Sequence, residues 1–380
     1  MNTEFNGIYN GITVLVTGHT GFKGSWLTIW LQKLGAKVIG FSLPEPVSIP
    51  SNFELNCLSE KMIDIRGDVR DLDAVKNVIN TYKPKIVFHL AAQPIVLKAY
   101  DDPKYTLETN SMGTANVLEA VRYCDSVEVV VCITSDKAYK NNEWVWGYRE
   151  TDTLGDTDPY SASKAMAELV IACYRTSYFS GQRMGNRMVE VCSTRAGNVV
   201  GGGDFADFRL IPDSMKALLV GKPIEIRNPN NVRPWQLVLE PLSGYLWLGA
   251  KMLQEKGQKY ASAWNFGPLT TGVTAGKVSD MLIKLWGKGS WVNVGTNVAK
   301  HEPNLLMLDW SKAKHEIGWR PIYTIEETLM DIIEWFRDYA SRNVAYGRVD
   351  MYQTCSNQID KYTNKAKEQG LEWALNNSQS

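Results

Sequence analysis

The sequence carries no excess of either charge: Lys plus Arg and Asp plus Glu number 41 each among 380 residues. This balance excludes the strong overall attraction to nucleic acid or to an anionic membrane that a basic protein has, so an anionic ligand needs a local site. Long apolar runs are absent too, because none approaches the roughly 18 residues of a membrane span. The N-terminal letters MNTEFNGIYNG lack the basic and then apolar pattern of a signal peptide. We therefore predict a cytoplasmic protein with no membrane and no nucleic acid among its partners.

Metal-binding and disulfide patterns are also missing. The six cysteines lie far apart, at positions 57, 124, 132, 173, 192 and 355, and no two of them form a C-x-x-C pair. Several stand in apolar segments, such as Val131-Cys132-Ile133 and Ile171-Ala172-Cys173. This arrangement is typical of buried thiols in a reducing compartment, and it predicts neither a disulfide framework nor a metal site.

What the sequence does have is a regular alternation of two kinds of segment. Short β-branched runs occur at 13–16, 37–41, 62–65, 86–90, 127–134 and 189–194, and segments of helical period occur between them near 24–34, 71–81, 103–123 and 158–180. Alternating strands and helices are typical of βαβ units. The predicted fold class is therefore α/β, with a doubly wound parallel (Rossmann) sheet of six strands in a cofactor-binding domain at residues 1–200.

This rhythm loosens after Gly201. The segment 201–340 contains GGGDF, the Pro-rich NPNNVRPW and shorter helical patterns near 210–220, 239–254, 274–286 and 324–340. We expect a smaller mixed α/β lobe here that binds the substrate, with room for segments that return to the sheet. The polar tail at 341–380 fits either a loose helix or an oligomer contact, and its role is not fixed by the sequence.

A glycine-rich turn joins the first predicted strand to the first predicted helix. Its glycines are Gly18, Gly21 and Gly24, in the letters TGHTGFKGS. At such positions only glycine permits a tight turn, a close backbone approach to a pyrophosphate and close packing of the helix on the strand. The N–H groups at the helix N-terminus then face the phosphates. The turn predicts a dinucleotide site, because a strand before it and a helix after it disfavour a turn without a ligand.

The G-x-x-G-x-x-G spacing of this turn resembles the extended short-chain dehydrogenase/reductase superfamily. Gly67-Asp68-Val69, His89-Leu90-Ala91-Ala92-Gln93 and Asn110 also fit that pattern. The resemblance implies NAD as the cofactor. It implies cofactor contacts from Gly18, His19, Thr20, Gly21, Phe22, Lys23, Gly24, Asp68, Val69, Ala91, Ala92, Asn110, Thr134, Tyr160 and Lys164. No Asp or Glu ends the second predicted strand directly, and Glu45 comes late, so the preference for NAD over NADP rests on the resemblance alone.

A tyrosine and a lysine stand four residues apart at the start of the helix predicted at 158–180. They are Tyr160 and Lys164, in the letters DPYSASKA, and this spacing places both side chains on one helix face. An ammonium beside a phenol favours the phenolate and lowers the tyrosine pKa from about 10. We therefore predict that Tyr160 is a base for a sugar hydroxyl and that Lys164 supports it.

The letters TSDKAY follow the strand predicted at 127–134, at the sheet edge where ligands bind in open α/β folds. The triplet Ser135-Asp136-Lys137, together with EWVWGYRE, DPYSASK, RAGNVVGGGD and RPWQ, closely resembles the CDP-glucose 4,6-dehydratase family from about residue 8 to residue 340. The alternative for Asp136 and Lys137 is an ion pair on the surface at the strand end. The context favours a catalytic pair.

The resemblance implies a redox-neutral loss of water from a CDP-sugar. Tyr160, held with Ser135 at the reacting hydroxyl, removes the C4 hydroxyl proton while C4 is oxidised. Elimination across C5 and C6 then needs an acid for the departing hydroxyl, Asp136, and a base for the C5 proton, Lys137. Lys137 must be neutral to act as a base and Asp136 must stay protonated, so the alternative is that the two roles belong to the pair rather than to either residue.

The substrate side is predicted from polar side chains that can bind a diphosphate or a sugar. The set comprises Gln93, Asn198, Arg209, Arg233, Gln236 and His301. The sequence departs from the family pattern in three places: Leu97 and Leu237 stand where the family has Arg and His, and Gly155-Asp156-Thr157-Asp158 replaces Gly-Gly-His-Asp. The dehydration chemistry is therefore better supported by the sequence than the identity of the base or of the hexose.

Three readings remain open after this comparison. The favoured one is a CDP-hexose 4,6-dehydratase, an enzyme of the hydro-lyase class. A nucleotide-sugar epimerase or reductase on the same scaffold would need only Tyr160 and a hydroxyl, so Asp136 and Lys137 speak against it. A non-catalytic protein that keeps its cofactor would not need Tyr160 and Lys164. Superfamily habit implies a homodimer or homotetramer formed through the helices at 103–123 and 158–180.

Overall fold

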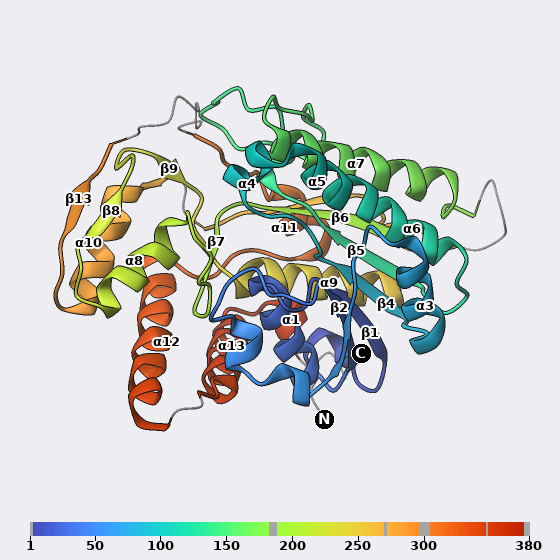
Figure 1. Ribbon diagram of the computed structural model, residues 1–380. Helices are drawn as coiled ribbons and strands as arrows, with labels where there is room; N and C mark the ends of the chain where they lie inside the picture. Colours follow the sequence, from blue (N-terminus) through green and yellow to red (C-terminus); the bar gives the residue numbers. More distant parts are fainter. Residues whose placement is uncertain (1–2, 182–187, 270–271, 296–304, 347–348, 376–380) are drawn as a thin grey trace.

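A seven-stranded parallel sheet forms the centre of the molecule (Figure 1). The computed structural model describes residues 3–181, 188–269, 272–295, 305–346 and 349–375. The strands of the sheet are β1 (Thr13–Thr17), β2 (Lys37–Ser42), β3 (Ile63–Arg66), β4 (Ile86–His89), β5 (Val129–Ile133), β6 (Glu190–Ala196) and β11 (Ala263–Phe266). Their order is β11-β6-β5-β4-β1-β2-β3. All six neighbouring pairs are parallel.

The predicted doubly wound sheet is confirmed: the six strands predicted within residues 1–200 are β1 to β6, and a seventh strand returns to the sheet from the segment 201–340. Besides the six predicted strands, β11 comes from the C-terminal half of the chain and pairs with β6 along Ala263 to Phe266. Its letters AWNF include two aromatic residues that favour strands, but the segment has only four residues and lies outside the regular alternation of strands and helices. Pairing with an open sheet edge, rather than local sequence, places this segment.

Helices cover both faces of the sheet (Figure 1). One face carries α1 (Phe22–Lys33), α9 (Leu239–Gln254) and α13 (Tyr352–Glu368), and the other carries α3 (Leu72–Tyr82), α6 (Gly113–Arg122) and α7 (Pro159–Ser177). Shorter helices are α2 (Asn52–Leu55), α4 (Val96–Asp101), α5 (Pro103–Leu107) and α11 (Ser311–Ile317), with 3-10 turns η1 (Glu4–Gly7), η2 (Leu58–Glu60), η4 (Asp136–Ala138) and η5 (Glu372–Ala374) and a π-helical turn η3 (Glu108–Met112). Within the described ranges, no helix combines the length and the apolar character needed to cross a membrane.

Small pieces of sheet and three further helices lie at the carboxyl side of the main sheet. Two-stranded pairs join β8 (Ile224–Ile226) to β13 (Trp291–Asn293), β9 (Val232–Arg233) to β12 (Val273–Thr274), and β7 (Val199–Val200) to β10 (Gln236–Leu237). The helices are α8 (Leu210–Leu219), α10 (Ala275–Trp286) and α12 (Ile325–Tyr346). This lobe flanks the sheet edge at which β5 and β6 end, so it supplies one wall of the site described below.

The tail that follows α12 forms an ordered part of the core. Its helix α13 packs on α1, and Lys33 of α1 donates a hydrogen bond to Ser356 at 2.6 Å. Trp373, beyond α13, is fully buried and stacks on Phe5 near the N-terminus, with ring centroids 5.1 Å apart. The two terminal segments therefore stabilise each other.

The cysteines are free thiols, as the sequence predicted, and five of the six are buried. The expectation that Cys173 is also buried was wrong, because its side chain lies on the outer face of α7. Ile171, two residues earlier, faces the sheet and is buried. Two residues correspond to just over half a turn of a helix with 3.6 residues per turn, so these side chains point in opposite directions, which an apolar stretch of sequence does not reveal.

Candidate active site

One large cavity lies where the strands of the sheet end, with a volume of about 470 Å³. Its wall is formed by the glycine turn after β1, the segments that follow β3, β4, β5 and β6, the first turns of α7, and the segment from 203 to 235. Ligands of open α/β sheets bind at this edge. The cavity brings together most of the residues that the sequence singled out.

The glycine turn has the close contacts that its spacing predicted. Gly18 has a φ of +72°, and a Cβ atom there would lie 2.7 Å from the backbone nitrogen of Ala91. A Cβ atom on Gly24 would lie 2.2 Å from the carbonyl oxygen of Gly18. Helix α1 begins after Gly21, so the N–H groups of its first turn lack helical partners and face the cavity end of the turn. This cradle fits the pyrophosphate of a dinucleotide.

The segment after β5 forms a short 3-10 turn, η4, that carries Asp136 and Lys137. Ser135 is its N-cap residue: its hydroxyl accepts a hydrogen bond from the backbone nitrogen of Lys137 at 3.2 Å and donates one to Oδ1 of Asp136 at 3.0 Å. Asp136 is buried, and Lys137 is half-buried; all three side chains line the cavity. Burial raises the pKa of Asp136, although the Lys137 charge and the Ser135 hydroxyl oppose this shift. A carboxyl group in this setting is suited to donate a proton.

Helix α7 packs directly on η4 and places Tyr160 and Lys164 beside this turn in the cavity wall. The helix starts sharply because Asp158 caps it, accepting a hydrogen bond from the nitrogen of Ser161 at 2.9 Å, and because Pro159 occupies its first position. Burial raises the pKa of Tyr160 to about 12, with the Ser135 hydroxyl acting in the opposite direction. This differs from the sequence-based expectation that Lys164 lowers the pKa of Tyr160, because burial outweighs any such help in the protein alone.

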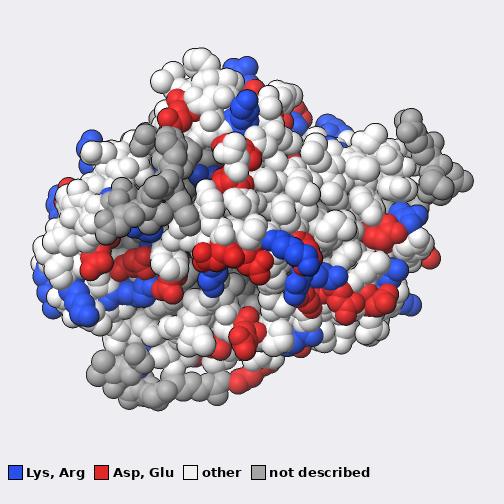
Figure 2. Space-filling model, turned by 45° about the horizontal axis from the view of Figure 1, so that its top comes forward, with Lys and Arg blue, Asp and Glu red and all other residues white. Residues whose placement is uncertain are grey.

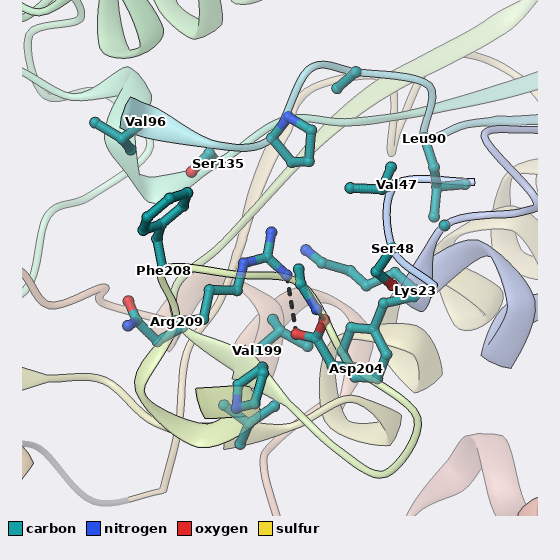
Figure 3. A pocket seen from close by; sticks show the side chains of 18 of the residues that line it. Lys23, Val47, Ser48, Leu90, Val96, Ser135, Val199, Asp204, Phe208 and Arg209 are labelled. Atoms are coloured by element: carbon teal, nitrogen blue, oxygen red, sulfur yellow. Dashed lines mark hydrogen bonds and ion pairs between the residues drawn. The ribbon is translucent and has the colours of Figure 1, made fainter. Parts of the chain in front are cut away.

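Three cationic side chains surround the centre of the cavity. Burial and the Lys23 charge lower the pKa of Lys164 to about 8, and burial and the Arg209 charge do the same for Lys23. Lys23 and Arg209 point toward one another across the cavity (Figure 3). Arg209 is held by Asp204, with Nη1 to Oδ2 at 2.9 Å. This concentration of positive charge is suited to an anionic ligand, although the protein as a whole is neutral.

The sequence-predicted residues fall into two groups. Those that line the cavity are Gly18, Thr20, Gly21, Phe22, Lys23, Gly24, Asp68, Val69, Ala91, Ala92, Thr134, Ser135, Asp136, Lys137, Tyr160, Lys164, Asn198, Arg209 and Arg233. His19, Gln93, Asn110 and Gln236 are buried beside it instead. His301 lies outside the described residues. The motifs therefore predicted which segments meet at the cavity, but they did not predict the direction of every side chain.

The four residues beside the cavity have internal partners that account for their direction. His19 binds Asp64 through Nε2 at 2.8 Å, and Gln236 donates to the carbonyl of Phe266 at 3.0 Å. Asn110 lies in the π-helical turn η3, accepts from the nitrogen of Gln93 at 2.8 Å and donates to the Ser163 hydroxyl at 2.9 Å. As placed here, these side chains support the wall of the cavity rather than face a ligand.

The lobe adds cavity residues that the sequence did not single out. Phe208, Arg227, Asn231 and Trp235 line the part of the cavity next to β8 and β9. The Pro-rich letters NPNNVRPW gave a sign of Asn231, Trp235 and the adjacent Arg227, because a loop that follows no period is where binding residues concentrate, but no pattern pointed to Phe208. The departures Leu97 and Leu237 are not among the lining residues, and Leu237 is buried in the core.

The exposed charges on one face of the molecule are mixed. On the face shown in Figure 2, Lys and Arg are interspersed with Asp and Glu, and neither sign dominates. The positive charge at the site therefore comes from the side chains inside the cavity.

The comparison with known families decides what the chain is related to. The family model described as GDP-mannose 4,6 dehydratase matches residues 15–332. The chain belongs to this dehydratase family. A CDP-glucose 4,6-dehydratase of Salmonella typhimurium is 46% identical over 331 residues, which cover 87% of this chain and 91% of that protein.

Solved structures related to the family share the fold. A UDP-glucose 4-epimerase of Thermus thermophilus in complex with NAD has a TM-score of 0.71 at 25% identity, covering 86% of this chain and 99% of that one. A dTDP-glucose 4,6-dehydratase of Bacillus anthracis in complex with NAD has a TM-score of 0.70 at 23% identity, covering 86% and 97%. The sheet and its helices are thus those of the superfamily that the glycine spacing indicated.

Proposed function

We propose that this chain is an NAD-dependent CDP-glucose 4,6-dehydratase, a hydro-lyase that converts CDP-glucose to CDP-4-keto-6-deoxyglucose. The observation that carries this proposal is the placement of Asp136 and Lys137 in the same cavity as Tyr160 and Lys164. Oxidation of a sugar alcohol needs Tyr160 and a hydroxyl, whereas elimination of water needs an additional acid and base. The 46% identity to the Salmonella enzyme supports the same substrate.

The residues of the glycine turn fit NAD. The positions of Gly18 and Gly24 leave no space for a Cβ atom, so the backbone can approach a pyrophosphate closely. Asp68 lines the cavity beyond β3, where it can bind the adenine end. When bound in this turn, NAD would supply a reversible hydride acceptor, which would make the reaction redox-neutral.

The first step falls to the residues of α7 and β5. Tyr160 takes the C4 hydroxyl proton, with Ser135 holding that hydroxyl in line. Because burial raises the pKa of Tyr160 to about 12, its deprotonation needs positive charge nearby. Lys164 provides one such charge, and the positively charged ring of the bound cofactor would add another.

The elimination step falls to the turn η4. The 4-keto group acidifies the C5 proton, and Lys137 removes it. Asp136, whose raised pKa favours the protonated form, donates a proton to the departing C6 hydroxyl. Asp136 and Lys137 are adjacent in sequence and affect each other's charge, so the pair can also share these roles.

The substrate side of the proposal uses the lobe. Arg209 and Arg233 are suited to the diphosphate because a guanidinium offers paired donors to phosphate oxygens. Asn198 also lines the cavity and can bind a phosphate or the sugar. Gln93, Gln236 and His301 remain predictions as direct substrate ligands.

The wider setting is proposed on the same basis. We infer a cofactor domain at 1–200, a substrate lobe at 201–340 from which α9 and β11 return to the sheet, and a tail at 341–380. We also infer a cytoplasmic homodimer or homotetramer. The product, a 4-keto-6-deoxy CDP-sugar, suits the synthesis of deoxysugars for a bacterial surface polysaccharide such as an O-antigen. Another nucleotide-sugar dehydratase, an epimerase or a reductase is the alternative.

The test is to incubate the purified protein with CDP-glucose in D₂O without a reductant. We expect loss of water, one deuterium at C5 and no net change in NADH absorbance. Mass spectrometry measures the loss of water and the deuterium, and the alkali-induced absorbance of a 4-keto sugar measures the product. If CDP-glucose stays unchanged while another nucleotide sugar is converted, the proposal that CDP-glucose is the substrate is refuted. Inversion at C4 without loss of water would refute the reaction class.

A further inference from the structure

A buried ion pair lies directly behind the wall of the cavity. Glu168 of α7 and Arg195 of β6 are each 3% exposed, and they form two parallel hydrogen bonds, Nε to Oε1 at 2.9 Å and Nη2 to Oε2 at 2.8 Å. Neither side chain lines the cavity. The pair is therefore placed to act on the site through other residues rather than on a ligand.

Both ends of the segment that carries the catalytic turn are attached to this pair. Thr134, just before Ser135, donates a hydrogen bond from its hydroxyl to Oε1 of Glu168. Tyr139, just after Ala138, accepts one from Nη1 of Arg195 at 2.7 Å. The Tyr139 hydroxyl in turn donates to Oδ1 of Asn265 on β11 at 2.8 Å. The turn is thus held on both sides by one charged contact.

The same pair is part of the helix that carries the other catalytic side chains. Tyr160, Lys164 and Glu168 follow each other at intervals of four residues on α7, so they share one helix face. Glu168 also accepts a hydrogen bond from the Ser193 hydroxyl of β6 at 2.7 Å. A displacement of the ion pair would move the turn η4 and helix α7 relative to each other.

The charged nature of the contact calls for a role beyond stability. A buried ion pair must offset the loss of hydration of both ions, and well-packed apolar residues of similar volume are often as stabilising. The oxygens of Glu168 are fully used by Arg195, Thr134 and Ser193. Such a saturated network fixes geometry, because each bond has a narrow range of length and angle.

We propose that Glu168 and Arg195 are positioning residues for the dehydration reaction, setting the distance between the turn that carries Asp136 and Lys137 and the helix that carries Tyr160 and Lys164. The inference rests on the proposed function for the identity of the steps, since the turn serves elimination and the helix serves oxidation. Tyr139 is the link from the pair to the turn, and Thr134 is the link to the strand end.

The test compares Glu168→Gln, Arg195→Met and the double variant, with Tyr139→Phe as a variant that changes a single hydroxyl. Because misplacement of reacting groups by about 1 Å can cost about 100-fold in rate, we expect each single variant to lose about 10- to 100-fold in kcat with KM changed by less than about threefold. Tyr139→Phe should slow the elimination more than the oxidation, so that bound NADH accumulates during turnover.

The double variant separates positioning from stability. Each single variant leaves one buried charge without its partner and should lower the melting temperature, whereas removal of both charges should restore much of it. We expect kcat to stay low in the double variant although its melting temperature recovers. Recovery of kcat together with the melting temperature would overturn the proposal. Lys361→Met is the matched control, because it removes the partner of the buried Asp331 in a part of the chain that does not line the cavity.

A substrate-independent measurement keeps the inference apart from the proposed function. Hydrogen exchange of the peptide that covers residues 134–139 should be faster in the double variant and in Tyr139→Phe than in the wild type, and unchanged in Lys361→Met. Unchanged exchange in the double variant would refute the positioning role whatever the substrate is. Failure of the wild type to dehydrate CDP-glucose, with faster exchange in the variants, would refute the proposed function and leave the positioning role supported.

Discussion

Gly197 faces the carboxylate of Asp136: a Cβ atom built on Gly197 would lie 3.1 Å from Oδ2 of Asp136 and 2.7 Å from Cγ of Pro234. Gly197→Ala would therefore push on the acid and on the segment that carries Arg233. We expect kcat to fall by about 10- to 100-fold, because catalytic groups tolerate little displacement. Steady-state kinetics with CDP-glucose measure this loss of kcat.

Gly276→Ala is the control for Gly197→Ala, because its added atom approaches Pro229 alone, at 3.3 Å. Equal activities of the two variants would contradict the expectation.

Asp136→Asn keeps the shape of the acid and removes its proton. If Asp136 protonates the departing hydroxyl, the variant still oxidises C4 but eliminates water about 10²- to 10⁴-fold more slowly. NADH absorbance should then rise to a level set by the enzyme concentration. Lys137→Met should in contrast block the exchange of the C5 proton with D₂O. Full turnover by Asp136→Asn would remove this residue from the mechanism.

Removal of the Lys23 charge should change the pH profile of the reaction. Burial and the Lys23 charge lower the pKa of Lys164 to about 8, so Lys23→Met raises the pKa of Lys164. Because the protonated form of Lys164 supports Tyr160, activity is lost as pH rises through that pKa. We expect the alkaline limb of kcat to begin near pH 8 in the wild type and at higher pH in the variant. Measurements of kcat against pH at saturating NAD test this expectation, and Lys37→Met, which removes an exposed charge, is the control. A limb that does not move would contradict the link between the two lysines.

Glu240 gives the fold itself a dependence on pH. It is buried in α9, accepts hydrogen bonds from the nitrogens of Ile322 and Tyr323 at 2.8 and 2.7 Å, and accepts one from the Tyr362 hydroxyl. Burial raises its pKa to about 7. The stability that its protonated form contributes is present below the ordinary carboxyl pKa and is lost as pH rises through about 7.

Glu240→Gln should remove that dependence, because an amide does not titrate: its oxygen can accept from the nitrogens of Ile322 and Tyr323, and its NH2 group can donate to the Tyr362 hydroxyl. We therefore expect the free energy of unfolding of the wild type to decline relative to Glu240→Gln between mildly acidic and neutral pH. Urea unfolding at several pH values measures the difference. A constant difference across this range would show that Glu240 does not titrate there.

Trp373 should contribute strongly to stability although it lies close to the end of the described chain. It is fully buried and stacks on Phe5 and Tyr362. Trp373→Ala should lower the free energy of unfolding by about 3–5 kcal/mol, the usual cost of such a truncation in a core. Leu375→Ala, at a side chain 37% exposed, should cost far less. Urea unfolding measures both free energies of unfolding. Equal losses in Trp373→Ala and Leu375→Ala would contradict the burial of Trp373.

The spacing of apolar residues along the sequence was enough to predict the sheet and most of its helices, since this spacing reflects the local strand or helix in which the residues lie. It could not predict β11, because AWNF becomes a strand through pairing with β6. The motifs likewise predicted the segments that meet in the cavity, such as the glycine turn and η4.

The direction of individual side chains depends on partners that are distant in the sequence. His19 turns to Asp64 on β3, and Gln236 turns to Phe266 on β11. The pairing of Glu168 with Arg195 also brings together two elements whose sequences carry no common signal. The cavity residues of the lobe, such as Phe208 and Arg227, lie on loops without a period, so local rules did not reach them.

The position of β11 has a consequence for how the protein is made. During synthesis on the ribosome, β6 emerges more than sixty residues before its outer neighbour, since the strands span 190–196 and 263–266. Until β11 arrives, the nascent chain presents an unpaired sheet edge, the kind of edge to which other chains can add. Asn265, which anchors Tyr139 beside the catalytic turn, arrives with that last strand. The support behind the catalytic turn is therefore completed only when the growing chain closes its own sheet.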